Sequence, residues 1–79
     1  LIMSYGYSVR IIKLNKKADG KLIGVRLGRI CIKRDVSVSE AASYLKVTRQ
    51  TIYNWFIGFS NPKGKKLDVI NCFLDTLKH

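Results

Sequence analysis

Residues 38–58, VSEAASYLKVTRQTIYNWFIG, contain two short helical patterns joined by a three-residue turn, and this spacing constrains the fold more than any other feature. Ser37 and Glu40 fit a capping box at the start of the first helix, and Thr48 can cap the second. Two helices joined so tightly must approach closely where they cross, and Ala42 is small enough to permit this. The apolar side chains that can fill the wedge between them are Leu45, Val47, Ile52 and Trp55.

A further helix is predicted before this segment, whereas the first 19 residues leave two alternatives open. Asp19 can cap a helix that runs to about Arg34. Gly24 and Gly28 lie on one stripe of this helix and indicate that another backbone packs close, because glycine otherwise weakens a helix. Residues 1–19 are basic, and the alternation in SVRIIKL is compatible with a short strand or an extended tail.

After the segment, Gly58 is predicted to end the second helix as a left-handed cap. Residues 59–66, FSNPKGKK, contain Pro and Gly and are predicted to form a loop. A last amphipathic helix is expected over 67–78. Its predicted buried face consists of Leu67, Ile70, Phe73, Leu74 and Leu77.

Length and charge bound the class of protein. Seventy-nine residues allow one small domain. Fifteen Lys and Arg against five Asp and Glu give a net charge of +10, which favours a polyanionic partner, nucleic acid first and an anionic membrane surface second. No apolar run approaches the roughly 20 residues that a membrane span needs, and we expect no membrane association.

Neither catalysis nor metal binding is expected. The five acidic residues never form a close pair, and the chain has no phosphate-cradling glycine loop. Cys31 and Cys72 are far apart and form no CxxC pair, so we expect no zinc site and no other cofactor. Both thiols are interpreted as small core hydrophobes of a cytoplasmic protein, with a disulfide left open by the sequence.

The segment 38–58 resembles the helix-turn-helix of the phage repressor and Cro family, and the likeness extends to its flanks. Leu22–Arg34 is similar to the family's first helix. Gly58, Pro62 and the apolar positions of the last predicted helix resemble the family's continuation. Lys46 departs from the family, which commonly places Gly at this left-handed turn position.

The resemblance also implies which side chains meet DNA. The helix over 49–57 would enter the major groove by its N-terminal end, so that its first exposed side chains reach base edges, where Arg suits guanine and Gln or Asn suits adenine. The predicted base contacts are Arg49, Gln50, Tyr53 and Asn54. The predicted DNA backbone contacts come from the same helix and its basic flanks: Thr48, Thr51, Lys63, Lys65, Lys66, Arg10, Lys13, Lys16 and Lys17.

The fold implied by this resemblance is all-α: a compact four- to five-helix repressor-like bundle, with a helix-turn-helix DNA-binding domain over residues 20–79 and an N-terminal basic arm over 1–19. The implied function is sequence-specific binding of double-stranded DNA by a transcriptional regulator of the phage repressor type, acting as a homodimer on the host nucleoid. Two alternatives stay open. One is a protein-interaction module or inhibitor that binds a host protein through the same scaffold, and the other is a sequence-neutral architectural DNA binder.

Overall fold

The computed structural model describes residues 7–78, and this range contains five α-helices and no strand. The helices are α1 (Val9–Lys17), α2 (Ile23–Lys33), α3 (Val38–Leu45), α4 (Arg49–Phe56) and α5 (Lys65–Lys78). The predicted all-α class is confirmed for this part of the chain. The first six residues of the predicted arm, and His79, lie outside the described residues.

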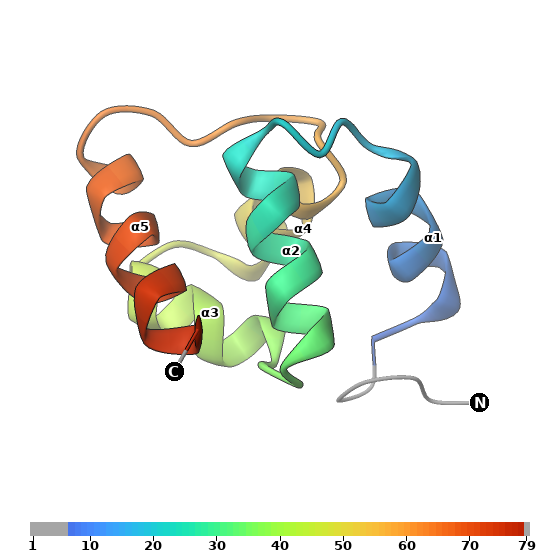
Figure 1. The fold of residues 1–79 in the computed structure, drawn as a ribbon, viewed down its shortest axis with the longest axis horizontal. Coiled ribbons are helices and arrows are strands. Elements are labelled where there is room, and N and C mark those ends of the chain that lie inside the picture. The colour runs from blue at the N-terminus through green and yellow to red at the C-terminus, as the bar shows by residue number, and fades with distance from the viewer. Residues whose placement is uncertain (1–6, 79) are drawn as a thin grey trace.

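Helix α2 stands in the middle of the bundle, with α4 behind it (Figure 1). Helix α1 covers one side of this pair, and α5 lies on the other side together with α3. The core lies where these helices meet, and its largest fully buried apolar side chains are Val25, Leu27, Cys31, Leu45, Ile52, Phe56 and Ile70. Helices α2 and α4 therefore form the centre on which the other three pack.

Two glycines allow α2 and α4 to approach each other closely. A Cβ atom on Gly24 would lie 2.8 Å from the Cβ and 2.9 Å from the carbonyl oxygen of Trp55. A Cβ atom on Gly28 would lie 2.8 Å from the Cγ of Phe56 and 2.6 Å from the Nδ2 of Asn15. These distances are shorter than real carbon contacts. The predicted close approach of another backbone is confirmed at Gly24, whereas the atoms closest to Gly28 belong to side chains.

Local side-chain signals place α3, α4 and the turn between them. The Ser37 Oγ accepts a hydrogen bond from the Glu40 N–H at 3.0 Å, and the Thr48 Oγ1 accepts one from the Thr51 N–H at 3.2 Å. Lys46 follows α3 in the left-handed conformation, with φ of 58° and ψ of 47°. Both predicted N-caps and the left-handed turn residue are thus confirmed.

The segment Val9–Lys17 is helical, so the prediction of a strand or an extended tail is wrong for this part of the N-terminal arm. The Ser8 Oγ caps the helix by accepting a hydrogen bond from the Ile11 N–H at 3.2 Å. Ile11 and Ile12 pack against the core, and Asn15 is buried beside them. Ile11, Ile12 and Asn15 follow helical spacing, but the third of these positions is polar, and the alternation in SVRIIKL also fits a strand.

The start of α2 also differs from its prediction. The helix begins at Ile23, with Leu22 as its N-cap. The Asp19 carboxylate accepts a hydrogen bond from the Lys21 N–H at 2.9 Å. Asp19 therefore caps the turn that precedes α2 and not the helix itself.

Helix α5 begins at Lys65, ahead of the predicted Leu67. Leu67, which the pattern predicts on the buried face, is 36% exposed in the first turn, so this prediction is wrong for Leu67. Cys72 is exposed because it lies two residues from the buried Ile70, on the opposite side of the helix. The interpretation of both thiols as core residues therefore holds for Cys31 and is wrong for Cys72, and both cysteines are free.

Candidate nucleic-acid interface

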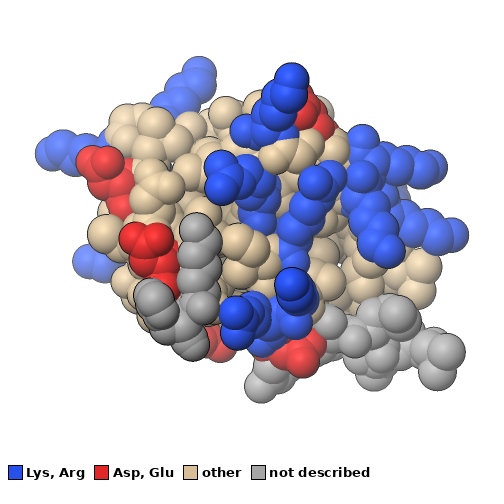
Figure 2. Space-filling view, viewed as in Figure 1, with Lys and Arg blue, Asp and Glu red and all other residues tan. Residues whose placement is uncertain are grey.

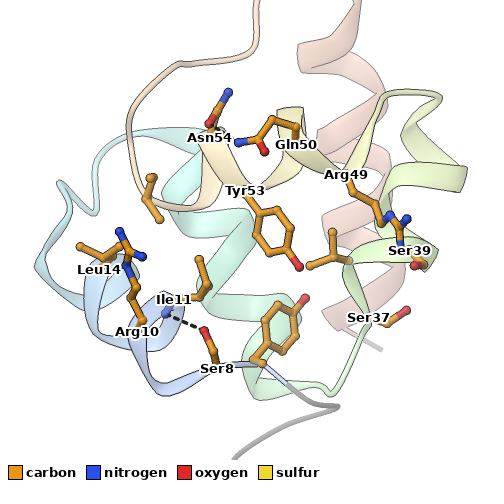
Figure 3. Close-up of a pocket in the computed structure, with 13 residues that line it drawn as sticks. Ser8, Arg10, Ile11, Leu14, Ser37, Ser39, Arg49, Gln50, Tyr53 and Asn54 are labelled. Carbon is orange, nitrogen blue, oxygen red and sulfur yellow. Dashed lines mark hydrogen bonds between the residues drawn. The ribbon is translucent and has the colours of Figure 1, made fainter.

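A groove of about 540 Å³ opens between α1, the start of α3 and one side of α4 (Figure 3). We call it the α1–α4 groove. Its lining residues are Tyr7, Ser8, Arg10, Ile11, Leu14, Ser37, Val38, Ser39, Arg49, Gln50, Tyr53, Asn54 and Ile57. Segments that are distant in the sequence therefore form one concave surface, and α1, α3 and α4 each contribute residues of their first turn to it.

All four residues predicted to contact bases line this groove. Arg49 and Gln50 are exposed, whereas Tyr53 and Asn54 are half-buried. Residues spaced by three and four positions share one side of a helix. The structure thus brings these four side chains together on one side of α4, facing α1 and the start of α3.

The two amide side chains of this set orient one another. The Gln50 Nε2 donates a hydrogen bond to the Asn54 Oδ1 at 3.1 Å. This arrangement leaves the Gln50 Oε1 as an acceptor and the Asn54 Nδ2 as a donor on neighbouring side chains. In the major groove, adenine presents the N6 amino group as a donor and N7 as an acceptor. Together the two amides therefore offer the complement of an adenine edge.

Tyr53 lies deeper than the other three. Its ring packs against the hydrophobic core and also lines the groove, where it points toward the centre in Figure 3. A half-buried ring presents only part of its surface to a ligand. Tyr53 therefore forms part of the groove floor, with Arg49 and Gln50 at the rim.

The groove is positively charged. Arg10 of α1 and Arg49 of α4 are its ionisable cations, and no Asp or Glu is among its lining residues. Both arginines are exposed. Elsewhere on the described surface, Lys and Arg side chains outnumber acidic ones in the view of Figure 2. An anion that enters the groove would meet two guanidinium groups and no carboxylate.

The structure gives other tasks to some residues predicted to contact the DNA backbone. The Thr48 hydroxyl caps α4 and lies 3.0 Å from the Thr51 hydroxyl. The Lys66 Nζ donates a hydrogen bond to the Leu45 carbonyl oxygen at 2.6 Å. Lys66 therefore ties the start of α5 to the end of α3, and its ammonium is already engaged.

The remaining lysines of the predicted backbone set are exposed. Lys63 and Lys65 lie before and at the start of α5 and do not line the groove. On α1, Lys13 and Lys17 are also exposed. Lys16 lines a second hollow of about 260 Å³ between α1 and α2, and it therefore faces away from the α1–α4 groove.

Two side chains that join α1 to the bundle carry no clear local signal in the sequence. The Asn15 Nδ2 donates hydrogen bonds to the Phe56 carbonyl oxygen at 2.7 Å and to the Val25 carbonyl oxygen at 3.1 Å. The Arg29 Nη2 lies within 3.0–3.4 Å of three carbonyl oxygens at the end of α1, those of Asn15, Lys16 and Ala18. Together they hold α1 against α2 and α4, which fixes one wall of the groove relative to the other.

Two titratable groups of the hydrophobic core, Cys31 and Tyr7, favour their neutral forms, and Tyr7 also lines the groove. Burial raises the pKa of the Cys31 thiol to about 12, and the nearby Glu40 carboxylate adds to the shift. Burial likewise raises the pKa of the Tyr7 phenol, whose hydroxyl donates a hydrogen bond to the Val36 carbonyl oxygen at 2.6 Å. A thiol that stays protonated is a poor nucleophile and a poor metal ligand. Within residues 7–78 no group of three or more His, Cys, Asp or Glu is placed to hold a metal ion.

Comparison of the chain with protein-family models, with curated proteins and with solved structures found no match. The likeness to the repressor family therefore depends on the residues of this chain alone. Among the described residues, no helix is both long enough and apolar enough to cross a membrane.

Proposed function

We propose that this protein is a sequence-specific double-stranded DNA-binding regulator that inserts the N-terminal half of α4 into the major groove. Arg49, Gln50 and Asn54 would contact base edges, with the outer edge of Tyr53 beside them. The proposal is supported most by one observation: all four side chains lie on one side of a single helix, in a surface that holds two arginines and no carboxylate.

The chemistry of these side chains suits the major groove, which is wide enough to admit an α-helix. The Arg49 guanidinium can donate two hydrogen bonds to the O6 and N7 of a guanine. The paired amides of Gln50 and Asn54 are already oriented by their mutual hydrogen bond, so they lose less side-chain entropy on meeting an adenine. We therefore expect the preferred site to contain at least one guanine and one adenine.

Regulation would act through occupancy. A protein on this site excludes or recruits the transcription machinery, without a cofactor and without a chemical step. One helix contacts only a few base pairs, and the family resemblance implies two copies on a palindromic site. The described surface includes an exposed aromatic residue, Phe59, close to the end of α4, where a second copy would have apolar area to cover.

Selection from a random duplex library by the purified chain tests the proposal. We expect an enriched consensus that is lost in a variant with Arg49→Ala and Gln50→Ala. Strong retention without any consensus would support the sequence-neutral architectural alternative instead. No retention near physiological salt would overturn DNA binding and leave the protein-interaction alternative.

Replacing Lys65 by alanine provides the matched control for that experiment. Lys65 is exposed, and it lies outside the α1–α4 groove. Its loss should weaken binding to all duplexes by a similar factor, because a contact to phosphate carries no sequence information. The Arg49→Ala variant should instead weaken binding to the consensus by about 1–3 kcal/mol and relax one base position. Equal effects of both variants on every duplex would contradict the assignment of Arg49.

A further inference from the structure

We infer that the α1–α4 groove holds the sugar–phosphate strand that borders the occupied major groove, and that Arg10 is its phosphate ligand on α1. This inference rests on the proposed function, because α4 must first lie in the major groove. It gives α1 a task different from that of a flexible basic arm. In this arrangement one DNA strand lies between two helices that are fixed relative to one another.

The position of α1 beside α4 leads to this inference. A helix in the major groove is flanked by the two sugar–phosphate strands that form the groove walls. Helix α1 stands next to the side of α4 that bears the predicted base contacts, and the hollow between the two helices is open to solvent. A strand that passes along this side of α4 must therefore pass in front of Arg10.

The lining of the groove matches the two chemical parts of such a strand. Ile11, Leu14 and Ile57 supply apolar surface on which a deoxyribose can pack. Arg10 supplies a guanidinium group for phosphate oxygens, whereas Arg49 stays with the base edges, and no Asp or Glu lines the groove. The volume of about 540 Å³ lies within the range of about 300–1,000 Å³ typical of sites that bind a nucleotide-sized group.

The two walls of the groove are held at a fixed separation. The Asn15 amide bonds the Phe56 carbonyl at the end of α4, and the Tyr7 hydroxyl bonds the Val36 carbonyl just before α3. The Arg29 guanidinium bonds carbonyl oxygens at the end of α1. A phosphate held by Arg10 would therefore be placed at a constant distance from the base contacts of α4, and α1 would set the register of the protein on DNA.

Arg10→Ala and Lys16→Ala form a matched pair that tests this inference. Both changes remove one positive charge from an exposed position of α1. Arg10 lines the α1–α4 groove, whereas Lys16 lines the hollow on the other side, so this inference places Lys16 outside the DNA contacts although the sequence predicted it as a backbone contact. Measured on the consensus duplex, Arg10→Ala should weaken binding about tenfold, as expected for one lost charge-assisted hydrogen bond. Lys16→Ala should weaken it about twofold or less, since its charge acts from a distance.

A scan with methylphosphonates locates the phosphate itself. Each phosphate of the consensus duplex is replaced in turn by its neutral methyl analogue, and binding is measured for the wild-type chain and both variants. Among the phosphates whose replacement weakens binding of the wild type and of Lys16→Ala, we expect one or two adjacent ones to lose their effect in Arg10→Ala. Arg10→Lys keeps the positive charge but lacks the planar guanidinium. Binding of this variant should stay sensitive to the same phosphates, and its affinity should fall less than that of Arg10→Ala.

The outcomes separate this inference from the proposed function. If the consensus depends on Arg49 while Arg10→Ala and Lys16→Ala behave alike and their methylphosphonate patterns are unchanged, the groove assignment is wrong and the DNA-binding proposal stands. If no duplex is bound, or if an RNA or a protein is bound instead, the proposed function itself fails. Circular dichroism of Arg10→Ala checks that the exposed substitution leaves the helices intact. Arg10→Lys serves as a second binding variant, in which the positive charge is kept.

Discussion

Replacing Asn15 by alanine tests whether one buried amide holds α1 on the bundle. Asn15 is 1% exposed, and its Nδ2 donates to the Val25 carbonyl oxygen at 3.1 Å and to the Phe56 carbonyl oxygen at 2.7 Å. Alanine removes both hydrogen bonds and leaves two carbonyl oxygens without this donor. The contact between α1 and the end of α4 is then left to apolar packing.

The expected loss of stability follows from those two bonds. Each contributes about 0.5–1.5 kcal/mol, and a buried group that loses its partner costs about 1–3 kcal/mol. Alanine favours a helix more than asparagine does, by about 0.5 kcal/mol, and this offsets a small part of the loss. We expect the free energy of unfolding to fall by about 2–4 kcal/mol, a large share of the roughly 5–10 kcal/mol typical of a small domain.

Urea unfolding, followed by circular dichroism and by the fluorescence of the buried Trp55, measures this loss. Asn71→Ala on α5 is the matched control, because it makes the same chemical change at an exposed helical position. Its effect should stay within about 0.5 kcal/mol. A loss below about 1 kcal/mol for Asn15→Ala, or equal changes in both variants, would refute the argument that the Asn15 amide ties α1 to α4.

Three further predictions concern single positions. Lys46→Gly should raise the free energy of unfolding by about 1 kcal/mol, because Lys46 has φ of 58° and glycine adopts this conformation without strain; a lower urea midpoint would contradict this. Gly24→Ala should lower it by about 1–3 kcal/mol, because the new Cβ would lie 2.8 Å from the Trp55 Cβ; an unchanged midpoint would show that α2 and α4 can separate freely. The free energy of unfolding should also fall as the pH rises from about 9 to 12, because the unfolded chain loses the Cys31 proton at a lower pH than the folded chain does. Urea unfolding curves measured over this pH range should show a weaker fall for Cys31→Val.

Parts of the fold that depend on local chemistry are predictable from the sequence. The hydroxyl groups of Ser37 and Thr48 cap the helices that follow them, and each bonds a backbone N–H three residues ahead. Gly58 has φ of 79°, as its position after α4 predicts. Such contacts involve neighbours along the chain, so the residue types alone indicate them.

The contacts that tie distant segments together are not predictable in this way. Asn15 bonds a carbonyl group 41 residues later, and Lys66 bonds one 21 residues earlier. In the sequence, an asparagine within a basic segment, or a lysine among other lysines, resembles any solvated polar residue. Only the three-dimensional arrangement shows that each satisfies a backbone oxygen of another element.

The candidate site likewise has a part that local sequence predicts and a part that depends on contacts between distant segments. Helical periodicity alone predicts that Arg49, Gln50, Tyr53 and Asn54 share one side of a helix. The opposite wall of the groove comes from α1, which hydrophobic alternation does not reveal as a helix. Sequence reasoning therefore finds the α4 half of the concave surface, and from the α1 half it names Arg10 but not the helix that positions it.

Helix α4 uses different residues for its fully buried core contacts and for the rim of the α1–α4 groove, and Tyr53 is the residue that takes part in both core and groove. Ile52 and Phe56 are fully buried against the core, whereas Arg49 and Gln50 are exposed and support no packing. Exchanging the exposed pair for other polar residues therefore changes the ligand chemistry of the helix without disturbing its seat on α2. A chain built in this way is a natural starting point for directed evolution, because a library at these two positions and at Asn54 would sample new specificities on one unaltered scaffold.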